Sequence, residues 1–305
     1  MDRGIHLLRE SIAGVRLDLV RIVLCGVRGS TPSPGPHYVR YGGNTSCVAL
    51  SHGHDAPTLV LDAGTGLQQL TPLLEGKAFR GTILLTHLHW DHTHGLPFFS
   101  GGDRDDASVK LVMPAQGDPV TLLERVISPP HFPITPSQLR GEWSFGSIEP
   151  GYHSIQGFSV QALEIPHKGG RMLGYRVSDS EASLAYLCDH SPIALGAGSQ
   201  GFGEYHPNAC TLAQGVDLLI HDAQHTAEEF PAVASFGHSA IDYAVGLAES
   251  CGVPRLLLFH HSPTRTDDEL DRIEAYWQDR TLHIEAAREQ MVIDLPTRPG
   301  GVSGS

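Results

Sequence analysis

The stretch LLTHLHWDHTHGLPFF at residues 84–99 concentrates side chains that can bind a metal ion. Four histidines and an aspartate fall within eight positions, directly after an apolar run. On extended backbone, side chains two positions apart point the same way, so His87 and His89 can both reach one ion. Asp91 keeps that spacing, and His92 follows where a helix could begin. The segment therefore offers three nitrogens and a carboxylate, enough to start two metal sites.

Further reactive side chains recur where apolar, strand-like runs end. They are His87 after ILLT, His167 after LEIP, Asp189 after AYLC, Asp222 after LLIH and His260 after LLLF. These strands alternate with helical segments, which implies an α/β fold. Because sites in such folds form at the carboxyl ends of the strands, we expect these side chains to line one site.

Helical spacing and capping signals predict helices over residues 67–76, 118–128, 239–251 and 266–280. The Pro- and aromatic-rich stretch 129–156 predicts instead an ordered surface loop or lid. Aromatic side chains in that stretch could stack on a substrate base, or they could simply close the core. The candidates are Phe132, Trp143 and Phe145.

Composition limits the classes of partner. The 305 residues include 34 Asp+Glu against 21 Lys+Arg, a formal net charge of −13 that disfavours nucleic acid and anionic lipid as partners. No apolar run reaches the ~18 residues of a membrane span. The five cysteines are widely spaced and lack CxxC pairing, which is typical of reduced thiols in a cytoplasmic protein. We expect an N-terminal extension over 1–19, one domain over 20–295 and a flexible tail over 296–305.

The motif THLHWDH resembles the signature of the metallo-β-lactamase superfamily. Other segments are similar to later motifs of its phosphodiesterase branch: IPHKGGRMLGYRV, YLCDH, LLLFHHSP, LVLDAGTGLQQL and the Gly/Pro-rich loop 26–47. The resemblance covers about residues 20–295. It implies an αββα sandwich, two mixed sheets flanked by helices, with the active site at one edge.

The resemblance also implies two metal sites. Carried over, His87, His89 and His167 would bind one ion, Asp91, His92 and His260 the other, and Asp189 would bridge them. Such a mixture of imidazoles and carboxylates suits two Zn²⁺ ions, with Mn²⁺ or Fe²⁺ as alternatives. His261 competes with His260 for the last position, and the strand-end alignment favours His260. His94 is more typical of a helix face than of a ligand.

Two segments, LLIHDAQHT and SFGHSA, resemble those of tRNase Z, the tRNA 3′-processing branch of this superfamily, in which an acid–histidine pair assists catalysis. Mapped onto this sequence, the pair is Asp222 and His238. We assign both to catalysis, together with Asp91. The alternative for His238 is a capping or packing role. His225 could line the pocket or lie on the surface.

One departure from tRNase Z bears on the substrate. That branch carries a long tRNA-gripping arm between the third-motif histidine and the bridging aspartate, whereas only 21 residues separate His167 from Asp189 here. With the acidic net charge, this favours a small phosphodiester of cyclic nucleotide type, attacked by a hydroxide bridging two ions. The alternatives are a tRNase Z-like RNA 3′-processing enzyme, a thioester or lactam hydrolase, and a non-catalytic scaffold. A homodimer stays open.

Overall fold

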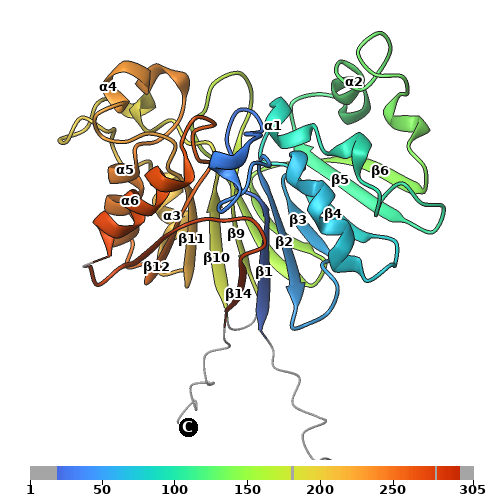
Figure 1. Ribbon diagram of the computed structural model, residues 1–305. Helices are drawn as coiled ribbons and strands as arrows, with labels where there is room; N and C mark the ends of the chain where they lie inside the picture. The colour runs from blue at the N-terminus through green and yellow to red at the C-terminus, as the bar shows by residue number, and fades with distance from the viewer. Residues whose placement is uncertain (1–18, 180–181, 279, 296–305) are drawn as a thin grey trace, which may run out of the picture.

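The computed structural model describes residues 19–179, 182–278 and 280–295. It shows two seven-stranded β-sheets packed face to face, with helices on their outer faces (Figure 1). This arrangement confirms the predicted αββα sandwich. The predicted N-terminal extension, apart from Leu19, and the predicted tail lie outside the described residues. No helix in the described ranges is long and apolar enough to cross a membrane.

The first sheet joins antiparallel strands to a parallel run. In spatial order its strands are β14 (Val292–Leu295), β1 (Val20–Gly26), β2 (Cys47–His52), β3 (Leu59–Leu61), β4 (Arg80–Leu84), β5 (Ser108–Pro114) and β6 (Glu142–Ile148). Pairing is antiparallel from β14 to β3 and parallel from β3 to β6.

The second sheet repeats this plan. Its strands, in spatial order, are β13 (His283–Ala286), β12 (Arg255–Phe259), β11 (Leu218–Asp222), β10 (Ser183–Leu187), β9 (Leu173–Ser178), β8 (Phe158–Glu164) and β7 (Gly151–Ile155). Pairing is parallel from β13 to β10 and antiparallel from β10 to β7.

Strand β1 shows why the sheets stack. Its side chains alternate between two apolar clusters, as the two-residue period of a strand requires. Ile22 and Leu24 join the central cluster shared with the second sheet, whereas Val23 and Cys25 join the cluster on the outer face of the first sheet. Both faces of β1 are therefore buried, which anchors the start of the loop 26–47 that follows it.

The helices are short and cover the outer faces. They are α1 (Trp90–Thr93), α2 (Pro119–Glu124), α3 (Pro207–Ala213), α4 (Phe230–Val233), α5 (Ile241–Ser250) and α6 (Asp267–Trp277). The helix predicted over 67–76 is instead the 3₁₀ helix η2 (Thr65–Leu74), which contains a proline that cannot donate a helical hydrogen bond. Further 3₁₀ turns are η1 (Pro36–Tyr38), η3 (Leu96–Phe98), η4 (Pro136–Gln138), η5 (Pro192–Leu195) and η6 (Ala234–Phe236).

The prediction of a loop or lid over 129–156 was wrong for its second half. That half forms β6 and β7, which lie at the edges of the two sheets. Edge strands are half exposed, so their apolar pattern is weak and hides the strand. Trp143 and Phe145 pack against the outer cluster of the first sheet and close the core there.

Candidate active site

The first group of candidate ligands consists of His87, His89 and His167. His87 and His89 follow strand β4, and His167 follows β8. Their ligand atoms and one from Asp189 all lie within 4.8 Å of one another. His89 Nδ1 is 3.3 Å from His167 Nε2, and Asp189 Oδ2 is 3.5 Å from His87 Nε2. Three imidazoles from two elements therefore converge on one carboxylate oxygen.

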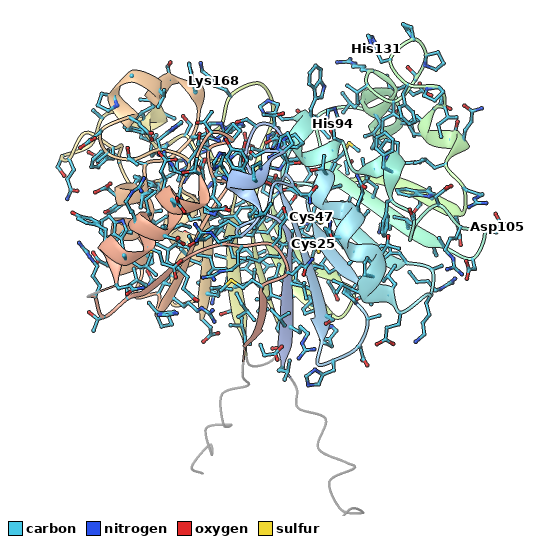
Figure 2. All side chains as sticks on the ribbon, viewed as in Figure 1. Cys25, Cys47, His94, Asp105, His131 and Lys168 are labelled. Carbon is cyan, nitrogen blue, oxygen red and sulfur yellow. The ribbon has the colours of Figure 1, made fainter. Side chains whose placement is uncertain are left out.

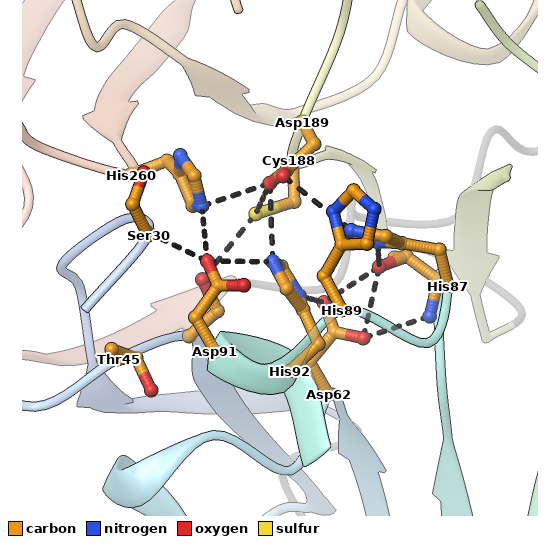
Figure 3. A network of polar contacts seen from close by, with 12 residues as sticks. Ser30, Thr45, Asp62, His87, His89, Asp91, His92, Cys188, Asp189 and His260 are labelled. Atoms are coloured by element: carbon orange, nitrogen blue, oxygen red, sulfur yellow. Dashed lines mark hydrogen bonds and ion pairs between the residues drawn. The ribbon is translucent and has the colours of Figure 1, made fainter. Parts of the chain in front are cut away.

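The second group consists of Asp91, His92 and His260, and it faces the other oxygen of Asp189 (Figure 3). Asp189 Oδ1 lies 3.2 Å from His92 Nε2 and 2.9 Å from His260 Nε2. Asp91 Oδ2 lies 3.3 Å and 3.1 Å from the same two nitrogens. Asp189 thus stands between the two groups with one oxygen toward each.

Hydrogen bonds on the far side of the rings determine which nitrogen faces the centre. His167 Nδ1 is 2.8 Å from the carbonyl of Gly237, so Nδ1 carries the proton and Nε2 has the free lone pair. His92 Nδ1 is 2.8 Å from a carboxylate oxygen of Asp62. The hydroxyl of Thr86 donates to Asp62 at 2.9 Å and lies 3.1 Å from His87 Nδ1, whose proton it can accept. These rings turn Nε2 inward.

Asp62 and the loop 26–47 are functional elements whose roles the sequence reasoning missed. Asp62 stands in the quoted segment LVLDAG, at the end of β3, which was the available signal. The loop supplies Ser30, whose backbone N–H donates to Asp91 Oδ2 at 2.7 Å. At Gly29 a Cβ would lie 2.4 Å from the His260 ring, so only glycine permits this close approach.

Three non-glycine residues of the site, Ser30, Asp62 and His260, have left-handed backbone, with φ of 62°, 60° and 57°. This conformation is uncommon for residues with a Cβ and persists only where surrounding contacts fix it. For His260 the ring contacts on both sides provide that fixation. The strain therefore marks positions where the orientation of a side chain matters.

Three buried atoms at the centre lack a hydrogen-bond partner among the described residues: His87 Nε2, His92 Nε2 and Asp189 Oδ2. Buried polar atoms are normally satisfied, and leaving one without a partner costs about 1–3 kcal/mol. All three belong to candidate metal ligands of the two groups. The donor set of nitrogens and carboxylate oxygens thus fits divalent cations, in keeping with the divalent ions that the fold implies.

Burial and charge act differently on the two groups. Burial lowers the pKa of His87, His89 and His167, so these imidazoles stay neutral and keep their lone pairs. Burial also opposes charge on His260, but Asp189 outweighs it and the pKa of His260 rises to about 10. The second group therefore attracts positive charge strongly, whether from a proton or from a metal cation.

Asp222 and His238 form a pair beside the second group. Asp222 ends strand β11, and His238 precedes α5. His238 Nδ1 lies 3.1 Å from Asp222 Oδ2, which leaves its Nε2 free. His238, Asp91 and Asp189 line a cavity of about 360 Å³. The pair can thus present an oriented imidazole to a molecule bound at the centre.

The structure brings all nine candidate site residues into one cluster and places three neighbouring histidines around it. His261 turns away, and its Nε2 bonds the carbonyl of Ala287 at 2.8 Å. His94 is exposed, with its ring stacked on Trp90. His225 is buried, with its ring 6.1 Å from that of His238. Of the adjacent pair of histidines, only His260 therefore reaches the cluster.

Residues 58–261 match a family model described as a β-lactamase superfamily domain. The chain belongs to this superfamily. It is accordingly a metal-dependent hydrolase of the metallo-β-lactamase fold. Among curated relatives, a ribonuclease Z of Lactiplantibacillus plantarum is 26% identical over 278 residues, which cover 78% of this chain and 88% of the relative.

Solved structures agree on the fold. The short form of human tRNase Z superposes with a TM-score of 0.63 at 20% identity, covering 90% of this chain and 99% of that one. A diphosphatase of the PhnP family gives the same TM-score at 18% identity, covering 91% of this chain and 98% of that one. At such identities the likeness shows the shared fold alone.

We expect Asp62→Ala to destabilise the protein by about 3–5 kcal/mol, because it leaves buried donors on Thr86, His92 and Tyr186 without their acceptor. Urea unfolding measures the change. Asp294→Asn is the control, since the ion pair of Asp294 with Arg21 is partly exposed and worth about 0–1 kcal/mol. Similar losses in the two variants would contradict the role given to Asp62.

Proposed function

We propose that this protein is a dinuclear metal-dependent phosphodiesterase that acts on small phosphodiesters of the cyclic nucleotide type. The observation that carries the proposal is the Asp222–His238 pair, which presents a free imidazole nitrogen to the cavity over the bridging carboxylate. A phosphodiester needs a proton donor for its leaving alkoxide, and a histidine held by a carboxylate is suited to that task.

The proposed ligand sets follow the two groups. One ion would be held by His87, His89 and His167, the other by Asp91, His92 and His260, with Asp189 shared. The nitrogen and carboxylate donors suit Zn²⁺. Two such ions would supply an activated water and stabilise charge on the phosphoryl oxygens.

The protein's own residues supply orientation and proton transfer. Asp62 and Gly237 hold the rings of His92 and His167 with Nε2 inward, so the ligand set is ordered before substrate arrives. Asp222 orients His238, whose Nε2 would pass to the leaving oxygen the proton that the attacking water releases. Asp91 lies beside the same cavity and positions the reacting groups through its carboxylate.

Between His167 and Asp189 the chain forms β9 and β10, paired antiparallel, and this short link supports a small substrate. We also propose a reducing, cytoplasmic location, since all five cysteines are free thiols.

A second candidate function is RNA 3′-end processing. It is favoured by relatives named ribonuclease Z, whose length the match covers to 88%. The acidic net charge of −13 opposes it.

A substrate panel separates these functions. Metal-loaded protein is offered bis(p-nitrophenyl) phosphate, 2′,3′- and 3′,5′-cyclic nucleotides, a pre-tRNA and a thioester, and initial rates are compared. We expect turnover of the small diesters and none of the thioester. Cleavage of the pre-tRNA at a much higher kcat/KM than any small diester would establish the second candidate. Thioester cleavage without diester turnover would refute both.

Replacing His238 with Ala should lower kcat for a small diester by about 10²–10⁴-fold, the usual contribution of a general acid or base. Metal content, measured by inductively coupled plasma mass spectrometry, should stay at the wild-type value. His283→Ala is the control, because this histidine is exposed at the start of β13, where it pairs with Arg255 at the opposite end of β12 from His260. Loss of metal with His238→Ala would mean that His238 is itself a ligand.

Adjacent histidines provide a matched test of the second metal site. His260→Ala should reduce bound metal from two ions to one, because it removes a nitrogen that faces both Asp91 and Asp189. His261→Ala should keep both ions, even if the lost bond to Ala287 lowers stability. Equal metal content in the two variants would contradict the assignment of His260.

A further inference from the structure

A second cavity, of about 490 Å³, has Trp90, Phe98 and Phe132 in its wall and shares Trp90 with the cavity over the candidate metal-binding cluster. We call it the aromatic cavity. Trp90 lines both this cavity and the one over the cluster. It can do so because it stands between His89 and Asp91 in the chain, with its Cα only ~3.8 Å from each of theirs. The two cavities therefore lie on either side of a shared wall residue, Trp90.

Two aromatic side chains of this cavity are exposed. Trp90 is 64% exposed and Phe98 is 57% exposed, although large rings usually bury most of their surface. Neighbouring rings hold them in place. Trp90 stacks on His94 with 5.8 Å between ring centroids, and Phe98 meets Phe132 edge-on at 5.7 Å. Ordered, exposed ring faces beside a reaction centre are typical of a ligand-binding surface.

Polar groups complete the cavity wall. Gln68, Arg125 and His131 line it, and Figure 2 shows His94 and His131 at the same edge of the molecule. Among the described residues, none forms a hydrogen bond or ion pair with the Arg125 side chain, so its donors are available to a ligand. The cavity therefore combines flat apolar faces with hydrogen-bonding groups, which an aliphatic ligand would not use.

We propose that the aromatic cavity binds the nucleobase of a nucleotide substrate whose phosphodiester lies over the metal cluster. The proposal rests on the proposed phosphodiesterase function and names its substrate class. Every base has a π face that can stack on Trp90 or Phe98 and polar edges that can bond Gln68 or Arg125. Phe132 is the one residue of the three suggested by the sequence that lines the cavity.

A binding experiment tests the cavity without turnover. Calorimetric titration of metal-loaded protein compares AMP with ribose 5-phosphate, which has the same phosphate and lacks the base. Because stacking on one ring contributes about 5- to 100-fold in affinity, AMP should bind at least fivefold tighter. Trp90→Ala and Phe98→Ala should each reduce that ratio, whereas replacing Tyr152, a 77% exposed ring on β7, with Ala should preserve it. Equal affinities for the two ligands in the wild type would overturn the proposal.

A kinetic experiment tests the same claim during reaction. Thymidine 5′-p-nitrophenyl phosphate and methyl p-nitrophenyl phosphate share a leaving group, and only the first carries a nucleoside. The ratio of their kcat/KM values should fall about tenfold in Trp90→Ala and in Phe98→Ala. Phe98 lies outside the segment HLHWDH (87–92) that carries candidate ligands, so its variant separates base binding from damage to the metal site. Metal content is measured in both variants.

The two proposals fail in different ways. If neither diester is turned over, the proposed phosphodiesterase function fails, and the titration with AMP still decides whether the cavity binds a base. If both diesters are turned over and the ratio is unchanged in both variants, the nucleobase assignment is overturned while the phosphodiesterase function stands.

Discussion

The carboxylate of Asp62 is fully buried where both sheets and the metal-binding segment meet. Its donors come from three elements: the backbone and hydroxyl of Thr86 after β4, the ring of His92 in α1, and the hydroxyl of Tyr186 in β10 of the opposite sheet. A buried charge costs several kcal/mol unless it is paired. Removing any one of these donors should therefore destabilise the protein. Asp62 thereby links the two sheets, and it orients His92 directly and His87 through Thr86.

The divided role of Asp189 depends on that constraint. Its two oxygens face different groups of imidazoles, and this is possible only if β10 and the HLHWDH segment keep their separation. The left-handed backbone of His260 and the absence of a Cβ at Gly29 show how tightly the remaining side is packed. Contacts within the fold therefore orient the side chains of the centre, as efficient electrostatic catalysis requires.

Local patterns in the sequence predicted much of this arrangement. The HxHxDH spacing and the reactive residues at strand ends indicated the site, because parallel strands bring their carboxyl ends to one edge. Long-range partners were beyond such patterns: Asp62 and Tyr186 lie 124 positions apart. The edge strands β6 and β7 were missed because half-exposed strands lack a strong apolar alternation. The proposed role of Trp90 in stacking could not be predicted from the sequence, because this residue stands inside the motif HLHWDH. Its exposure in the structure is what suggests that role.

The most direct test of the two-site centre is a crystal structure of the zinc-reconstituted protein with anomalous data collected at the zinc edge. The account predicts two peaks, one bounded by His87, His89 and His167, the other by Asp91, His92 and His260, with an oxygen of Asp189 at each. A single peak at saturating zinc, or two peaks that do not share Asp189, would contradict it.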